Sequence, residues 1–558
     1  MRSSALRPAE ALGLRESARP SRSWLASLDA KLDSSTLLQA VVVGLISLMP
    51  ALILAPFITG PLMNDEGIFA TLAVSLLHGG LPYRDLFEVT PPGTYGLYAL
   101  GFLLFGQEAW VPHALLVVAL CLTTALIFVE ARLLFSVRTA ICAALAFAAS
   151  MAMVVVGVIA VDEYFVLLPI SAAYVAFTLA IKGKGKGWLL VAGVLSGLAA
   201  ITNQTSVVHF VFLVCLYVRS ARSSSASFSC KALALPFAGF GLVYIALATP
   251  YFVTGSFGDF WYGTVVFPLL YAGGTPLLQR FISSGFGIVW FCLIASPLLA
   301  LSGKGALALK REPSSLSKTI VVGWSIGSVV AIAATGRFFH YYFVALLPPL
   351  ALLAGIALTQ PPRLVPTRHL RKLVVVCALG AAISFSLFVN AKVYLQPSAA
   401  GRLVARISPR VELHSIKGPE VGRYIASRTG RDDLIYNLGL HGEIYFYANR
   451  RPASRFFHEF SVIDNEGNLR QLLRDLEANR PTYIVDTQWP QYLEGTSVKY
   501  LSEIGDFIDQ NYVLEKRMEF DPKDIQMYEK AIGRSDSSRK LTYQSDIYRL
   551  KEAGGSGN

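Results

Sequence analysis

Charged residues are scarce in this chain of 558 residues, and their scarcity excludes most classes of soluble enzyme. Only 15% of the residues are Asp, Glu, Lys or Arg, 54% are hydrophobic, and the mean hydropathy is +0.50. Such values are typical of proteins that cross a membrane many times. The first apolar run begins only near Leu37 and is long enough to span a bilayer, so we expect no cleaved signal peptide.

Paired cysteines and common cofactor motifs are also missing. The six cysteines form no CxxC pair, and all lie in apolar runs or in loops expected to face the cytoplasm. This distribution argues against structural disulfides and zinc sites. The sequence contains no P-loop, no GxGxxG, no HExxH and no internal repeat. It therefore lacks the signatures of P-loop enzymes, dinucleotide-binding enzymes and zinc proteases.

Long apolar runs, by contrast, are frequent, and each predicts a membrane helix. They lie near 37–58, 112–129, 139–160, 164–181, 188–202, 206–218, 232–252, 281–301, 319–335, 341–359 and 373–391. The runs at 188–202 and 206–218 are short for a bilayer that needs about 20 residues. These two can form a tight or re-entrant hairpin. The sequence thus predicts a polytopic α-helical membrane protein with about 11 transmembrane helices.

The formal net charge of +12 comes from basic residues that gather in alternate loops. These residues are Arg132, Arg138, Lys182, Lys184, Lys186, Arg219, Arg222, Lys231, Lys304, Lys310, Arg311, Lys318, Arg363, Arg368, Arg371 and Lys372. The remaining loops are acidic. This alternation predicts that the N-terminus and the basic loops are cytoplasmic and that the acidic loops are external. It also explains the net charge without a nucleic-acid partner.

Four regions follow from these patterns. Residues 1–36 predict a disordered cytoplasmic tail, and residues 37–395 predict a transmembrane domain whose first external loop is 61–111. Residues 396–552 contain no spanning run, and short β-rich runs alternate there with helical patterns, which predicts an external α/β domain. Residues 553–558 predict a disordered end. The β-rich runs lie at 433–437, 482–485 and 543–549, and one helical pattern lies at 468–478.

Two of the external segments contain amphipathic or aromatic patterns. In the first loop these patterns predict helices over about 67–77 and 95–105, separated by an irregular stretch that ends at Pro91-Pro92-Gly93. The two prolines predict a rigid turn that positions the preceding residues. A later segment, 254–280, is rich in aromatic residues, as is typical of a helix in the lipid headgroup layer.

Two pairs of adjacent carboxylates are the strongest candidates for chemistry. Asp65 and Glu66 follow the first apolar run, and Asp162 and Glu163 lie between the third and fourth, all on the external side. Charge beside hydrocarbon is costly to hold, which indicates a functional site. The alternative is that these acids are only solvated residues of external loops.

Four further residues are candidates for binding a substrate. Arg337 and His340 lie at the external end of the tenth run, where a cation could bind a lipid phosphate. The alternatives are an arginine that reaches to the interface and a histidine within an aromatic belt. Arg84, next to Tyr83, could contact phosphate or pair with Asp85.

At this point the sequence resembles a known group, the glycosyltransferase C superfamily. The similarity is to the branch of protein O-mannosyltransferases and lipid A aminoarabinose transferase, and it covers most of the chain from about residue 37. It rests on the segments NDEGIFATLAVSLLHGGLPYRD and PPGTYGLYALGFLLFG of the first loop, VDEYF at 161–165, RFFHYYFVALLPPLALLAG, and YNLGLHGEIYFYANRRPASRF at 436–456.

The resemblance implies an inverting glycosyltransferase, hexosyl or pentosyl, at the outer face of a bacterial inner membrane. It also implies a polyprenyl-phosphate sugar as donor and an envelope lipid, glycan or protein as acceptor. Relatives often have Lys directly before the Pro-Pro pair, whereas this chain has Thr90. Arg337 or Arg84 would then replace that lysine as the partner of the donor phosphate.

The residues suit this chemistry, because an acceptor hydroxyl becomes a good nucleophile once a carboxylate removes its proton. We expect Asp65 to be this base and Glu66 to orient it or a substrate hydroxyl. Asp162 and Glu163 are expected to bind the acceptor or a sugar hydroxyl. No cofactor is required by the sequence, although clustered carboxylates could hold a divalent metal.

Two alternatives stay open. A lipid-linked glycan ligase or polymerase would keep the enzyme class, but those proteins more often depend on a long, late external loop with arginines and histidines. A secondary transporter would place ionisable residues near the bilayer midplane, often in repeated halves. Here the acids gather at the outer ends of the runs.

Overall fold

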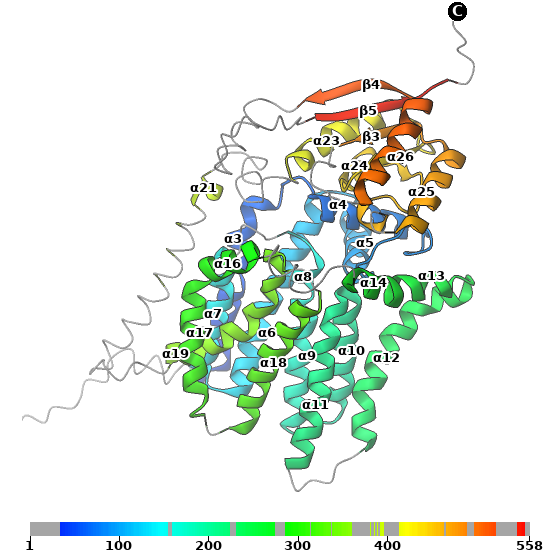
Figure 1. The fold of residues 1–558 in the computed structure, drawn as a ribbon. Helices are drawn as coiled ribbons and strands as arrows, with labels where there is room; N and C mark the ends of the chain where they lie inside the picture. The colour runs from blue at the N-terminus through cyan, green and yellow to red at the C-terminus, as the bar shows by residue number, and fades with distance from the viewer. Residues whose placement is uncertain are drawn as a thin grey trace, which may run out of the picture.

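The computed structural model describes residues 34–153, 159–223, 230–273, 285–312, 314–335, 338–359, 380, 384, 388, 391–395, 412–462, 465–487, 496–519 and 544–552. Figure 1 shows long helices side by side, a sheet with its own helices at one end, and short helices between these two parts. The short helices include both predicted helices of the first loop.

Within the described residues, six helical segments are long and apolar enough to cross a membrane. They are Thr36–Phe57, Trp110–Leu134, Asp162–Ile181, Lys231–Val253, Ser315–Ala334 and Tyr341–Thr359. The elements that form them are α2 (Thr36–Ser47), α3 (Met49–Leu54), η1 (Ala55–Phe57), α6 (Trp110–Leu134), α8 (Asp162–Phe165), α9 (Leu167–Ile181), α12 (Cys230–Val253), α18 (Ser315–Ala334), η5 (His340–Leu346) and α19 (Leu347–Thr359). A seventh span results if α16 (Gly285–Ile294) and α17 (Ser296–Leu309), which are bent by 77°, cross together.

Among the described residues, three apolar helices besides α5 (Gly93–Phe105) fall short of the length of a span. They are α7 (Val137–Met153), α10 (Gly187–Thr202) and α11 (Val207–Ser223). At 1.5 Å per residue the 16 residues of α10 extend about 24 Å, less than the roughly 30 Å of a bilayer core. The short helix η3 (Gln204–Ser206) joins α10 to α11. The count of about 11 helices stays a prediction, and most of the run 373–391 lies outside the described residues.

The layer of short helices contains α4 (Asn64–Leu77) and α5 (Gly93–Phe105), close to the positions predicted for the first loop. The helix α4 begins earlier than predicted because the Glu66 side chain accepts a hydrogen bond from the Met63 backbone and closes its first turn. The segment after α12 forms α13 (Phe257–Trp261), a π-helical turn at Tyr262–Val266, and α14 (Phe267–Gly273), which run across the long helices in Figure 1. Exposed Trp261 and Leu269 fit the predicted place at a lipid interface.

The C-terminal part contains a five-stranded mixed sheet. Its strands are β1 (Leu434–Leu438), β2 (Arg451–Pro452), β3 (Tyr483–Asp486), β4 (Tyr512–Glu519) and β5 (Gln544–Leu550), in the order β2-β1-β3-β5-β4. The strands β2, β1 and β3 are parallel, and β5 is antiparallel to both β3 and β4. Three strands lie where the sequence predicts them, whereas β2 and β4 were not predicted.

Helices flank this sheet: α23 (Glu412–Ala426), α24 (Glu443–Ala448), α25 (Glu466–Asn479) and α26 (Thr496–Asn511). Two short helices complete the described elements, α21 (Ala391–Tyr394) and η6 (Glu459–Ser461).

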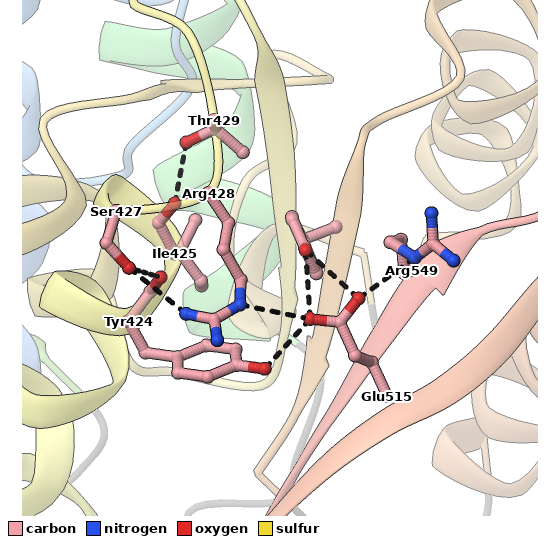
Figure 2. Close-up of polar contacts among 8 residues, drawn as sticks. Tyr424, Ile425, Ser427, Arg428, Thr429, Glu515 and Arg549 are labelled. Atoms are coloured by element: carbon pink, nitrogen blue, oxygen red, sulfur yellow. Dashed lines mark hydrogen bonds and ion pairs between the residues drawn. The ribbon is translucent and has the colours of Figure 1, made fainter.

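Figure 2 shows that Glu515 of β4 contacts residues at the end of α23 and on the strand β5. Its Oε1 accepts a hydrogen bond from the Tyr424 hydroxyl at 2.8 Å, and its Oε2 pairs with Arg549 Nε at 2.9 Å. Arg428 Nε lies 3.4 Å from the same Oε1. Because these arginines are exposed, such pairs add little stability, but they fix the position of the edge strand.

The C-terminal part packs directly on the first loop through α24 and α4. Thr71 of α4 donates a hydrogen bond to the Gly442 carbonyl at 2.9 Å, and the Tyr447 hydroxyl accepts one from the Leu62 backbone at 3.0 Å. A Cβ on Gly67 would lie 2.1 Å from the backbone nitrogen of Glu443, so only glycine allows this approach. The division of the chain at residue 396, and an external position for its second part, stay predictions.

Candidate active site

The two predicted carboxylate pairs lie in the first turns of two helices, α4 and α8. Asp65 and Glu66 follow Met63, and Asp162 and Glu163 follow Val161; Met63 and Val161 are extended. A helix N-terminus carries partial positive charge, which favours negative groups there. The two turns are in contact, because Glu66 Oε1 accepts a hydrogen bond from the Ala160 backbone at 2.6 Å. The structure therefore brings both pairs together.

Glu66 is fully engaged in hydrogen bonds. Its Oε1 binds the backbone N–H of Ala160, and its Oε2 accepts from the Met63 N–H at 2.8 Å and lies 3.2 Å from Nε2 of His113. Burial alone would raise the pKa of Glu66, but the charge and hydrogen bond of His113, with the two backbone N–H groups, hold that pKa below its usual range. Glu66 thus joins α4 to α6 and to the start of α8.

His113 of α6 is the partner that links Glu66 to the first membrane segment. Its Nδ1 lies 2.9 Å from the Ile58 carbonyl, and its Nε2 faces Glu66. Because a carbonyl and an ionised carboxylate can only accept, both ring nitrogens carry hydrogen and the imidazole is positively charged. The arrangement places one positive charge beneath the carboxylate cluster.

Asp65 differs from its neighbour, because no hydrogen bond or ion pair holds it within the described part of the chain. Its side chain is half-buried. Burial, together with the charges of Glu88, Asp162 and Glu66, raises the pKa of Asp65 to about 7, while the charge of His458 opposes this rise. A carboxylate with this pKa can both accept and release a proton near neutral pH.

In the second pair it is the first carboxylate that is held. Asp162 Oδ2 accepts a hydrogen bond at 2.6 Å from Nδ2 of Asn203, whose own Oδ1 binds the Thr205 backbone and caps η3. The turn predicted at Asn203-Gln204-Thr205 therefore also orients Asp162. Glu163 lines a pocket between the helices.

This pocket is partly open and lies between α8 and α9 on one side and η3, α11, α18 and η5 on the other. It is lined by Glu163, Val166, Ile170, Asn203, Thr205, Ser206, His209, Ala331, Ile332, Thr335, Tyr342 and Ala345. Polar and apolar side chains both contribute, and buried Ser206 Oγ has no hydrogen-bond partner among the described residues. The pocket can therefore accept a ligand with a polar head and an apolar body.

Glu88 adds a fifth carboxylate, which lies between α4 and α5. Its Oε1 accepts a hydrogen bond from the Thr90 backbone at 3.0 Å, and its Oε2 lies 2.9 Å from Nε2 of His458 in the C-terminal part. Burial raises the pKa of Glu88, but His458 and Thr90 bind the ionised form and hold the pKa below its usual range. Thr90 stands where members of the family that this sequence resembles often have lysine. Its backbone N–H binds the carboxylate of Glu88.

The other predicted binding residues are placed differently. Tyr83 is 1% exposed and lies in an aromatic cluster with Phe87, Tyr251 and Phe260. Arg84 pairs with Asp85 through Nε–Oδ1 and Nη2–Oδ2 contacts of 2.7 and 2.5 Å.

Of the remaining two predicted residues, Arg337 lies outside the described residues. His340 begins η5, and its side chain lies outside them. The roles of all the predicted residues stay predictions. Among the described residues, no group of three or more His, Cys, Asp or Glu side chains is arranged to hold a metal ion.

Sequence reasoning missed Glu88, His113, Asn203 and His458 as parts of the site. Glu88 had a signal, since it is an acidic residue shortly before the Pro-Pro turn. His458 had none, because its partner lies about 370 positions earlier in the chain and only the tertiary fold joins them.

Comparison with known proteins agrees with this architecture. Residues 89–251 match the family described as dolichyl-phosphate-mannose-protein mannosyltransferase. No curated protein matches the sequence. Among solved structures, ArnT from Cupriavidus metallidurans bound to undecaprenyl phosphate is similar, with a TM-score of 0.59 and 14% identity over 94% of this chain and 100% of that one.

A second similar structure is the oligosaccharyltransferase AglB from Archaeoglobus fulgidus, solved with an inhibitory peptide and a dolichol-phosphate. Its TM-score is 0.51, with 12% identity over 80% of this chain and 69% of that one. The fold is thus that of a class of membrane glycosyltransferases. The family match over residues 89–251 and this fold together indicate the glycosyltransferase C superfamily, with relatives of the ArnT and protein O-mannosyltransferase types.

Proposed function

We propose that this protein is an inverting glycosyltransferase that moves a sugar from a polyprenyl-phosphate donor to an acceptor of the cell envelope. The observation that supports this proposal most is the state of Asp65. It has a pKa of about 7 and no bonded partner among the described residues, whereas its neighbours Glu66, Asp162 and Glu88 are held by hydrogen bonds or ion pairs. A general base works best when its pKa is near the working pH.

In the proposed reaction Asp65 accepts the proton of an acceptor hydroxyl. The oxygen then forms a bond to the anomeric carbon as the bond from that carbon to the phosphate oxygen breaks. The sugar inverts, and polyprenyl phosphate leaves with the bonding electrons. Because the leaving group is a phosphate ester of low basicity, the reaction needs a base and groups that stabilise negative charge more than it needs a general acid.

The pocket beside Glu163 is the proposed site of the donor. Glu163, which lines the pocket, interacts electrostatically with Asp65, and this supports a donor bound near the proposed base. The polar wall contributed by Asn203, Thr205 and Ser206 suits a headgroup, and Ile170 and Ile332 suit the start of a polyprenyl chain. The undecaprenyl phosphate bound to the similar ArnT structure supports this class of donor.

The proposed location is a bacterial inner membrane, with the carboxylate cluster and the C-terminal part on the outer face. The alternation of basic and acidic loops supports this orientation. Reporter fusions at Lys184 and after Gln396 would test it, with a cytoplasmic signal expected at the first site and an external signal at the second. A cytoplasmic signal after Gln396 would contradict the proposal, since the cluster would then face the cytoplasm.

The transfer itself is tested by mass spectrometry of envelope glycans and lipid-linked sugars from cells with and without the protein. We expect loss of one glycan modification and accumulation of its lipid-linked donor. Purified protein should then transfer that sugar with inversion, which NMR of the product's anomeric proton would show. Unchanged glycans and donor pools, or retention of configuration, would contradict the proposal.

A further inference from the structure

The C-terminal part reaches the carboxylate cluster through His458, just before η6. The ring is 2% exposed, and its Nε2 lies 2.9 Å from Glu88 Oε2 and 3.2 Å from the Phe87 carbonyl. Both partners can only accept, so Nε2 carries the hydrogen. Phe87 and His458 are 371 positions apart in the sequence. The contact therefore exists only when the two parts of the molecule are packed together.

Two further contacts hold the backbone on either side of this pair. The Phe87 N–H donates to the Arg455 carbonyl at 2.9 Å, and Arg455 Nη1 pairs with Asp259 Oδ1 at 2.9 Å. The segment that carries His458 is thus fastened to the first loop and to α13. His458 has little freedom to leave Glu88, so its effect on the cluster is fixed by the fold.

We propose that His458 is a positioning residue for the transfer reaction, which binds Glu88 in its ionised form and, when protonated, offsets the negative charge around Asp65. The inference rests on the proposed function only in taking Asp65 as the base. It makes the C-terminal part a contributor to the chemistry, in addition to its role in packing.

The charges around Asp65 come from several elements. His458 lowers the pKa of Asp65, whereas Glu88, Asp162 and Glu66 raise it. The groups that interact with Asp65 are Glu66 of α4, Glu88 of the loop, Tyr98 of α5, Asp162 and Glu163 of α8, and His458. Glu88 in turn interacts with Tyr83, Tyr95, Asp162 and His458. After burial, the charge of Glu88 is the largest influence that raises the pKa of Asp65. His458 is bonded to this residue.

Two substitutions are expected to move the pKa of Asp65 in opposite directions. His458→Gln keeps an N–H donor for Glu88 but removes the imidazole whose electrostatic influence lowers the pKa of Asp65, so that pKa should rise. Glu88→Gln removes the negative charge, so that pKa should fall. Each shift is expected to be about 1 pH unit, at the low end of what a neighbouring charge produces.

The first readout does not need a substrate. Because the pKa of Asp65 is raised from 3.8 to about 7, folding stability from its protonated form is lost as the pH rises between these values. The difference in Tm between Asp65→Asn and the parent protein should therefore grow with pH and level off above about 7. The pH at which this Tm difference levels off should rise in the His458→Gln background and fall in the Glu88→Gln background.

The second readout is the pH profile of kcat/KM for sugar transfer by the purified full-length protein. Its acidic limb should move in the same two directions, so that raising the pH restores most of the activity of His458→Gln. A histidine with only a packing role would lower activity at every pH. The matched control is His441→Gln, since His441 is also buried and lies 2.8 Å from Glu443 in the same part of the molecule.

In the control, we expect the pH at which the Tm difference levels off and the acidic limb of the kcat/KM profile to stay within about 0.2 pH unit of the parent. This is well below the shift that a neighbouring charge produces. The inference would be overturned if these two pH values were equal in all variants, or if they shifted in the same direction in His458→Gln and Glu88→Gln. If His458→Gln does not fold, His458→Asn tests the same role, because Glu88→Gln shifts the pKa of Asp65 whatever His458 does. Absence of sugar transfer by the parent protein would instead contradict the proposed function, while the Tm measurement would still decide the role of His458.

Discussion

The first turns of α4 and α8 carry the same dipeptide, Asp followed by Glu, yet they hold it in opposite ways. In α4 the glutamate is bonded to three partners and the aspartate to none among the described residues. In α8 the aspartate is bonded to Asn203 and the glutamate faces the pocket. Each turn therefore has one carboxylate that fixes the backbone and one that is available to a ligand. The comparison shows that identical local sequence acquires its role from the elements packed against it.

The largest effect is expected from the available carboxylate of α4. Asp65→Asn keeps the size of the side chain but cannot accept a proton at neutral pH. We expect kcat to fall by about 10²-fold or more, the scale of a general base. Donor binding should change much less, because a base acts mainly in the transition state. The assay is sugar transfer by purified protein, with donor binding measured separately.

The matched control for this experiment is Glu108→Gln, an exposed acid of the same loop, which should keep parental turnover. The Tm supplies a further check. Because Asp65 is costly to ionise in the folded state, Asp65→Asn should raise the Tm at pH 8 while it abolishes transfer. Nearly parental turnover in Asp65→Asn would show that the comparison assigns the wrong residue as the base.

The available carboxylate of α8 should give the next largest effect. Glu163→Gln replaces a carboxyl group of the pocket wall by an amide, and a typical hydrogen bond contributes roughly 0.5–1.5 kcal/mol. We expect about a tenfold loss of kcat/KM, mostly through a higher KM, because the residue binds a ligand and does not move the proton. Steady-state kinetics at varied donor and acceptor concentrations would measure it. A kcat effect as large as that of Asp65→Asn would give Glu163 a share in proton transfer.

The bonded carboxylate of α4 should give the smallest loss of kcat/KM and the clearest loss of stability. Glu66→Gln weakens the contact to charged His113 but keeps a side chain that can bond Met63 and Ala160. We expect a several-fold lower kcat and a Tm lower by a few degrees, the reverse of the Tm change expected for Asp65→Asn. Thermal unfolding followed at neutral pH would compare the two. A larger loss of turnover in Glu66→Gln than in Asp65→Asn would transfer the role of base to Glu66.

The sequence predicts the elements of this fold better than the contacts within its site. The helices α4 and α5 and the strands β1, β3 and β5 follow from local periodicity and lie close to their predicted places. The strand β2 has only two residues, too few for a pattern, and the exposed face of β4 gives no regular alternation. The physical reason why Asp65 and Glu66 differ could not be derived from the sequence, since the partners of Glu66, such as His113 and Ala160, lie far from it along the chain.

The packing of α24 against α4 has a consequence for how the protein is made. The hydrogen bond between Thr71 and Gly442 can form only after the 371 residues that follow Thr71 have been synthesised. At a synthesis rate of about 5–20 residues per second, this delay is roughly 20–75 s. A ribosome that stops before residue 442 would therefore release a chain whose membrane helices can insert. The helix α4 of its first loop would lack the packing contact with α24. Premature termination late in the gene should thus yield an inserted protein without an assembled catalytic loop.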